Sequence, residues 1–574
     1  MEKFVIRTVC CIVILVLCGI LFPPRSHAAS RPDAGTILRD LKDEPALPER
    51  QPDVKIETKP DVIVPEVAGP KVLVKGFRIK GETIFKEEAL AASLQEYIGK
   101  ELTFSELQKT AEKITAYYTA HGYVARAYLP PQEIKDGIVD IAVIEGRFED
   151  VVPDKESDSR LDFQRAKKYI TASQGLGEPI SMDRLERGML ILHDIPGVAA
   201  SSTLQPGTKE GMVQQAIKLM NTPFITGNID LDNTGQRASG EYWLRGGINL
   251  NNLSGIGDRI SIAALGAFDD RYTLRTQYGR IAYSLPAGYS GLNLGASLAA
   301  MGYNLGADFK AMEEEGGSTV YRLFASYPII RQRQHNLIIT ATYDHEQLYD
   351  EANKVTTSNK RIDVATLGLN EDIFDRLLGG GYTSLGMSFT IGRLDLARCQ
   401  ADFNADQASA KTHGEYKKAT LHLSRLQRLA EKTSLKLNLM QQFAFENLDS
   451  SEDFSLGGAY GVRAYPAGEA SGDEGTLFTV ELQQRLTQKI SVFGFYDFGR
   501  IKTNHTEWIT TRIPNSYHLE GIGGGITYIT PGDFLVTATI AGRLGNNPDR
   551  DASGNDSDGT KRSPRIWVLA SKYF

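Results

Sequence analysis

The sequence predicts a multidomain chain in which two small α+β modules precede a transmembrane antiparallel β-barrel of about 16 strands. Three observations support this fold class. An export signal occupies the start of the chain, helix-like periodicity ends near residue 220, and strand-like alternation fills residues 221–574. Together they indicate an exported protein whose membrane part is built from strands.

Residues 1–29 have the features of a signal peptide. Lys3 and Arg7 come first, residues 9–22 form an apolar run, and small residues around Ala28 suit cleavage. An uncleaved anchor is the alternative, but the apolar run is short for crossing a bilayer. Three of the four cysteines lie in this segment, which leaves Cys399 alone and excludes an internal disulfide in the mature chain.

Composition and motifs argue against several classes of function. Asp and Glu total 71 against 64 Lys and Arg, so the basic footprint of a nucleic-acid partner is missing. The nine histidines are scattered, and no zinc-protease, redox, nucleophile-elbow or P-loop motif is present. The glycines of residues 521–525 sit in an alternating strand and not in a dinucleotide-binding loop. We therefore expect no enzyme, no cofactor and no metal.

Residues 30–70 predict a short helix and a linker ahead of the modules. Within 30–44, Ile37, Leu38 and Leu41 fall on one face of a helix. Six prolines and many charges are spread over residues 45–70, and such a segment forms an extended tether and not a core.

Helical spacing and strand runs over residues 71–148 predict a β-α-α-β-β module. Thr103 and Glu106 form a capping box at the start of its second helix, and Gly122 suits that helix's end. Residues 149–220 repeat the same order more loosely. The chain therefore carries two similar modules before the barrel.

Alternation of apolar and polar residues marks the strands of residues 221–574. Runs such as 242–250 and 435–445 are about ten residues long, the length of a tilted membrane-crossing strand. A soluble β-sandwich or propeller also alternates. The export signal and the apolar, aromatic last strand, which ends at Phe574, favour a barrel. Closure follows because lipid offers no partner to an open sheet edge.

Two segments in the barrel region stand out. The first is a glycine-bounded stretch, residues 457–466, that carries Arg463 between two tyrosines. The second is the strand segment 495–499, where Asp497 is the one carboxylate among aromatic residues. A guanidinium can engage such a carboxylate with two hydrogen bonds. From physics alone, a loop arginine in solvent and an aspartate facing lumen water are equally acceptable.

These segments, with four others, resemble the haemolysin and haemagglutinin secretion/activation family, the two-partner secretion transporters of the Omp85 superfamily. The resemblance covers nearly the whole mature chain, and its two modules resemble POTRA domains. The other matching stretches are 192–198, 204–207, Asp232-Asn233-Thr234-Gly235 and Tyr327-Pro328-Ile329.

The resemblance implies a sixth extracellular loop that folds into the barrel and meets its inner wall. The matching residues are Val462, Arg463 and Tyr465 at the loop tip and Phe495, Asp497 and Gly499 on the wall. Ala464 replaces the family's glycine, and a positive φ there would strain it. Residues 30–44 match the family's plug helix. Phe574 matches a C-terminal signal for the barrel-assembly machinery, although Lys572 departs from that signal.

The implied function is export of a partner exoprotein through the barrel lumen of the outer membrane of a Gram-negative bacterium. Periplasmic POTRA domains would capture the unfolded client, with outer-membrane lipid around the barrel. An assembly factor of the same superfamily is the first alternative, but such factors usually carry three or more POTRA domains. A porin or receptor is the second, and it leaves residues 71–220 unexplained. The sequence does not name the client.

Overall fold

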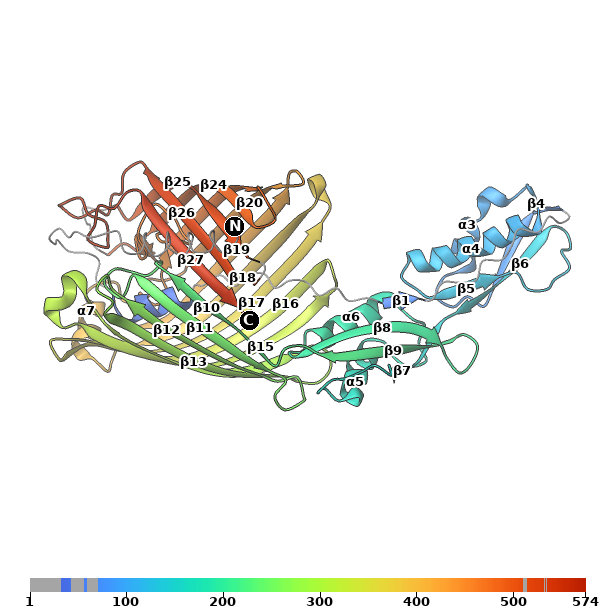
Figure 1. Ribbon diagram of the computed structural model, residues 1–574, viewed down its shortest axis with the longest axis horizontal. Helices are drawn as coiled ribbons and strands as arrows, with labels where there is room; N and C mark the ends of the chain where they lie inside the picture. Colours follow the sequence, from blue (N-terminus) through green and yellow to red (C-terminus); the bar gives the residue numbers. More distant parts are fainter. Residues whose placement is uncertain (1–31, 43–55, 59–70, 509–513, 531, 533) are drawn as a thin grey trace, which may run out of the picture.

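The computed structural model describes residues 32–42, 56–58, 71–508, 514–530, 532 and 534–574. The predicted signal peptide and most of the predicted linker lie outside these ranges. A wide barrel occupies one end of the molecule, and two small modules extend from it in a row (Figure 1). None of the helices in the described ranges is long and apolar enough to cross a bilayer.

The first module has the predicted order of elements. Its elements are β2 (Val72–Leu73), β3 (Gly76–Lys80), α3 (Glu87–Ala92), β4 (Glu101–Leu102), α4 (Phe104–Ala120), β5 (Ala125–Tyr128) and β6 (Ile138–Glu145). The main sheet runs β3-β6-β5. Thr103 and Glu106 form both hydrogen bonds of the capping box that begins α4. Leu107, Ile114 and Tyr118 of α4 are buried, so the helix packs its apolar face on this sheet.

The second module repeats that plan and recruits a strand from the N-terminal segment. Its elements are β7 (Arg147–Pro153), α5 (Phe163–Ser173), α6 (Met182–His193), β8 (Val198–Pro206) and β9 (Met212–Asn221). The sheet order is β1-β8-β9-β7, where β1 (Ile56–Thr58) pairs parallel to β8. Part of the predicted tether is therefore fixed to the second module.

Sixteen antiparallel strands form a closed barrel, which confirms the predicted fold class. They are β10 (Ile225–Asp232), β11 (Tyr242–Asn251), β12 (Arg259–Phe268), β13 (Leu274–Pro286), β14 (Asn293–Asn304), β15 (Glu315–Arg331), β16 (His335–Ala352), β17 (Val355–Asp375), β18 (Gly381–Asp395), β19 (Gly414–Arg428), β20 (Thr433–Ala444), β23 (Glu474–Arg485), β24 (Ile490–Lys502), β25 (Ser516–Ile529), β26 (Phe534–Leu544) and β27 (Arg565–Tyr573). Closure comes from β27 pairing with β10.

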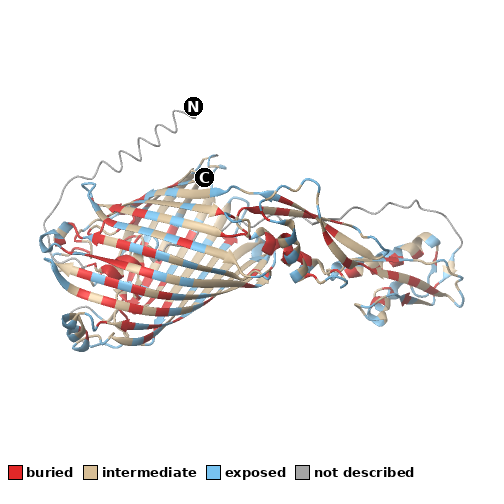
Figure 2. Ribbon diagram, turned by 90° about the horizontal axis from the view of Figure 1, so that it is seen from below, coloured by how far each residue is buried: buried red, intermediate tan, exposed pale blue. Residues whose placement is uncertain are grey.

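Exposed and buried residues alternate along these strands, as the banding in Figure 2 shows. On β14, Leu294 and Leu298 are exposed, whereas Ala299 and Met301 are buried. Exposed leucines on the outer surface of a barrel mark the face that lipid covers. The buried set faces a lumen that other parts of the chain fill.

The second module is joined to the barrel mouth by ion pairs and backbone contacts. Arg331, at the end of β15, donates two hydrogen bonds to the Asp194 carboxylate, at 2.6 and 2.8 Å. Arg187 of α6 donates to the backbone carbonyls of Pro328 and Ile329. These contacts hold the second module against the entrance of the lumen.

Candidate functional site: the filled barrel lumen

A long loop between β20 and β23, residues 445–473, folds back into the lumen and is called loop 6 below. Its base is tied by the short strands β21 (Phe454–Ser455) and β22 (Ser471–Gly472). At its tip, Val462, Ala464 and Tyr465 are fully buried and pack against the inner wall. The tip is therefore part of a packed cluster and not a solvent loop.

Arg463 and Asp497 meet in this cluster with bidentate geometry. The guanidinium donates from Nε to Asp497 Oδ2 at 3.0 Å and from Nη2 to Oδ1 at 2.9 Å. The backbone N–H of Arg463 donates to the same Oδ2 at 3.1 Å. Thr479, opposite Asp497 on β23, donates its hydroxyl to Oδ1 at 3.0 Å. The fully buried carboxylate is thus surrounded by donors, as a buried charge requires.

The same guanidinium has two further partners. Its Nη1 donates to Glu481 Oε2 at 2.7 Å. Its central carbon lies 3.3 Å from the centroid of the Phe495 ring, which is a cation–π contact. Glu481 lies directly opposite Phe495 in the β23–β24 register. Sequence reasoning missed Glu481, because the pairing register of β23 and β24 was unknown and neither neighbouring motif includes it.

Glycines on the wall make room for the tip. A Cβ at Gly499 would lie 2.7 Å from Leu456 and 2.8 Å from Val462, closer than side chains tolerate. A Cβ at Gly521 would lie 2.8 Å from the Cβ of Ala464. The φ angle of Ala464 is not positive, so its backbone carries no left-handed strain. Ala464 therefore fits at the tip with an ordinary backbone conformation, and the missing side chain of Gly521 leaves room for its Cβ.

The tip is also anchored to the last strand and the loop before it. Trp567 of β27 donates its indole N–H to the backbone carbonyl of Arg463 at 2.8 Å. Glu469 of loop 6 accepts hydrogen bonds from Asn547, at 2.5 Å, and from the backbone N–H of Ser557, at 2.8 Å. Sequence reasoning identified none of these three partners, since no local pattern marks them.

Helix α2 (Ala34–Lys42) lies inside the barrel, where Figure 1 shows it in dark blue. Ala34, Ile37 and Leu38 are buried in one cluster with apolar residues of the inner wall. Those wall residues include Met301, Tyr303, Leu348 and Ile362. A helix that buries its apolar face in this way fills part of the lumen.

Polar contacts fix both ends of α2 to the wall and to loop 6. Asp33 lies 3.3 Å from Lys360 and accepts a hydrogen bond from the Ser450 hydroxyl at 2.7 Å. The backbone N–H of Ala34 donates to Asp350 at 2.8 Å. Near the other end, Arg39 donates to the Ser471 hydroxyl at 2.6 Å. All of these bonds are non-covalent and reversible.

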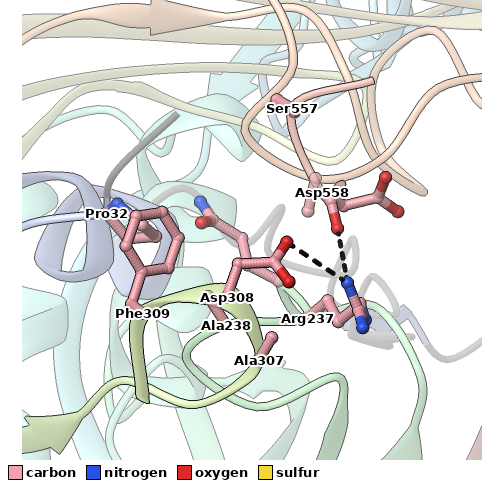
Figure 3. A pocket seen from close by; sticks show the side chains of 10 residues that line it. Pro32, Arg237, Ala238, Ala307, Asp308, Phe309, Ser557 and Asp558 are labelled. Atoms are coloured by element: carbon pink, nitrogen blue, oxygen red, sulfur yellow. Dashed lines mark hydrogen bonds and ion pairs between the residues drawn. The ribbon is translucent and has the colours of Figure 1, made fainter. Parts of the chain in front are cut away.

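Loops on the outer side close over the start of α2, and Figure 3 shows the pocket they leave. Arg237 lies between the Asp308 carboxylate, at 3.8 Å, and the backbone carbonyl of Asp558, at 3.1 Å. Phe309 and Pro32 also line this small space. Within the described ranges, no group of three or more His, Cys, Asp or Glu side chains is arranged to hold a metal ion.

Comparison with known families agrees with this arrangement. Residues 215–528 match the family model described as "Haemolysin secretion/activation protein ShlB/FhaC/HecB", and residues 72–146 match "POTRA domain, ShlB-type". The chain belongs to the haemolysin secretion/activation family. This is a family of outer-membrane transporters, and it places the POTRA domains of the present transporter in the periplasm.

Individual relatives match the transporter over most of its length. A "Heme/hemopexin transporter protein HuxB" of Haemophilus influenzae is 29% identical, with 92% of this chain and 94% of that protein covered. An "Outer membrane transporter CdiB" of Dickeya dadantii is 23% identical over 73% of this chain and 74% of its own. The solved structure of CdiB from Escherichia coli has the same fold, with a TM-score of 0.68 at 19% identity over 89% of this chain and 93% of its own.

The C-terminal Phe574 of the transporter continues the seam of the barrel. Its backbone N–H donates to Gly227 at 3.0 Å, and Gly227 donates back at 2.8 Å. The Phe574 side chain is exposed. This position, at the end of β27 beside β10, leaves the aromatic ring accessible from outside the barrel.

Proposed function

We propose that this transporter exports an unfolded partner exoprotein through its barrel lumen, after the periplasmic POTRA domains receive the client. The main support for the proposal is a closed barrel whose lumen contains α2 and loop 6, both held there by reversible, non-covalent contacts. The second POTRA domain lies at its entrance. A pore that conducted small solutes passively would need neither a displaceable helix and loop in its lumen nor POTRA domains at its entrance.

Opening this path requires two rearrangements. Helix α2 must leave the apolar patch of the inner wall, and the Arg463 tip must move from Asp497. The contacts broken are hydrogen bonds, ion pairs and apolar packing, so no covalent step or nucleotide is involved. Folding of the client outside would then make export directional.

The POTRA sheets offer edges for an extended client segment, which adds as a strand through backbone hydrogen bonds. In the first domain, β5 is an outer strand. In the second domain, the outer edge of β8 is taken by β1, so a client strand could add there only in place of β1. The relatives' names point to different cargoes, heme/hemopexin and hemolysin, so the proposal concerns the route and not a particular client.

Two further partners belong to this proposal. Lipid of the outer membrane covers the exposed apolar face of the barrel. The exposed aromatic ring of Phe574, at the end of the last strand, is available to the barrel-assembly machinery during biogenesis.

Deletion of residues 71–220 tests the proposal in cells that also express a partner exoprotein whose export depends on this transporter. We expect the client to disappear from the medium, while heat-dependent gel mobility shows that the barrel still folds. Unchanged export would contradict the proposal. A general loss of other outer-membrane barrels would instead favour an assembly factor.

A further inference from the structure

The periplasmic rim of the barrel has two different parts. The turns after β11, β13 and β15 pack on the second POTRA domain, as the Arg331–Asp194 pair illustrates. Where β17, β19 and β23 end, the chain instead carries the same two residue types in succession. These pairs are Arg376-Leu377, Arg428-Leu429 and Arg485-Leu486.

The leucines of these three turns are unusually exposed. Leu377 is 64% exposed, Leu429 is 55% exposed and Leu486 is 52% exposed. Leu378, next to the first of them, is 79% exposed, the highest value among the exposed large hydrophobic residues in the described part of the chain. Exposed apolar side chains that recur in one row mark a contact surface.

The alternation of the strands sets the direction of two of these leucines. Leu429 is in step with Leu423, an exposed residue six positions earlier on the outer face of β19, and Leu486 is in step with Leu482 of β23. These two leucines therefore continue the outer, lipid-covered face of the barrel. Leu377 lies in a short 3₁₀ turn, Leu377–Gly379, so the alternation of β17 does not set its direction.

The turn that displays Leu377 and Leu378 is rigidly built. The side-chain amide of Gln427 donates to the carbonyls of Leu377, Leu378 and Gly380, at 3.0, 3.1 and 3.0 Å. Arg425 holds that amide in place through its oxygen, at 2.7 Å. Leu378 has a φ of 50°, a left-handed conformation that is costly for leucine. Because these hydrogen bonds fix the conformation of the turn, Leu377 and Leu378 are held in their exposed positions.

Two of the arginines donate hydrogen bonds to the backbone of neighbouring turns, and the three turns together carry more basic than acidic residues. Arg428 donates to the carbonyl of Gly379 at 3.0 Å, and Arg485 donates to the carbonyl of Glu431 at 3.1 Å. The basic residues of the three turns and of the strand ends beside them are Arg376, Arg428, Lys432, Arg485 and Lys489, against the acids Glu431 and Asp375, and Asp375 pairs with Arg425. Basic residues beside apolar ones at a membrane surface attract anionic lipid headgroups.

We propose that these three turns form an interfacial anchor for anionic phospholipids of the periplasmic leaflet. The leucines enter the boundary between headgroups and acyl chains, and the arginines lie beside lipid phosphates. A client segment is the less suitable occupant, because Leu429 and Leu486 are in step with the lipid-covered face. The anchor would fix the part of the rim that these three turns form.

The position of the leucine row is tested with a fluorescent label on full-length protein in nanodiscs. The label is placed at Leu378→Cys in a Cys399→Ser background, with Lys354→Cys on the outer turn between β16 and β17 as the matched control. In phosphatidylglycerol-containing bilayers, we expect iodide to quench the label at 378 several-fold less than the label at 354. Equal quenching at the two positions would overturn the proposal.

The charge requirement is tested by native mass spectrometry of retained lipid. Each of Arg376→Gln and Arg428→Gln is expected to weaken phosphatidylglycerol binding about fivefold relative to phosphatidylcholine. Arg500→Gln, at the outer end of β24, should change nothing. Folding is checked by heat-dependent mobility. Unchanged lipid retention in both rim variants would refute the anchor, and so would a loss of client export without a change in lipid binding.

Discussion

Replacement of Arg463 by alanine is expected to release the tip of loop 6. The change removes three side-chain hydrogen bonds to carboxylates and the contact with the Phe495 ring. It also leaves the fully buried Asp497 without its cation. Breaking one side of a buried ion pair costs about 3–5 kcal/mol. Each 1.4 kcal/mol is tenfold, so the ratio of undocked to docked tip should rise about 100-fold or more.

Conductance in planar bilayers measures this release, and export of the client measures its consequence. Arg322→Ala is the matched control, because Arg322 also makes a bidentate pair on the wall, with Asp344 at 2.6 and 2.7 Å, and that pair does not involve loop 6. Arg463→Ala should open the channel far more often than the control. Arg463→Lys keeps the positive charge but loses the two-pronged geometry of the guanidinium, so its opening frequency should lie between those of the wild type and Arg463→Ala. If Arg463→Ala and Arg322→Ala open equally often, the reasoning fails.

Three other changes test the remaining contacts. Leu38→Asp puts a charge into the apolar cluster that holds α2, so channel conductance should rise. A conductance equal to that of the wild type would show that α2 does not block the lumen. In the first POTRA domain, burial alone would raise the pKa of Glu145, but hydrogen bonds from Thr83, Ile84 and Tyr118 together outweigh it and hold the pKa below its usual value. That stability is present at neutral pH and lost as pH falls through the lowered value, so hydrogen exchange over residues 72–146 should rise in acid, and Glu145→Gln should reduce this dependence. Arg331→Ala should loosen the second POTRA domain, seen as faster proteolysis between the modules and the barrel and lower export; an unchanged cleavage rate would contradict it.

Local patterns predicted much of this molecule. Alternation over residues 221–574 revealed the strands, because a wall between lipid and lumen requires a period of two. The capping box at Thr103 located α4, because such a cap depends on residues only three apart. The pairing of β1 with β8 was not foreseen, since three residues among prolines carry too little signal to mark a strand.

Contacts between distant segments were harder to foresee. Asp497 stood out because it interrupts an aromatic strand. Physics alone left Arg463 as a candidate partner beside an equally acceptable solvent position, and the family resemblance favoured the pair. Glu481 and Trp567 look like ordinary wall residues in the sequence. Their roles depend on how β23, β24 and β27 are placed around the tip, which is set by barrel closure and not by any local motif.

The bond between Trp567 and the carbonyl of Arg463 has a consequence for biogenesis. The two residues are 104 positions apart, and Trp567 lies on β27, the strand that closes the barrel by pairing with β10. During synthesis, the tip of loop 6 emerges before the strand that completes its binding site. Full docking must therefore wait until β27 has paired and the barrel is closed. The position of the tip thus depends on completion of the barrel, and an unclosed barrel would leave the tip without one of its anchors.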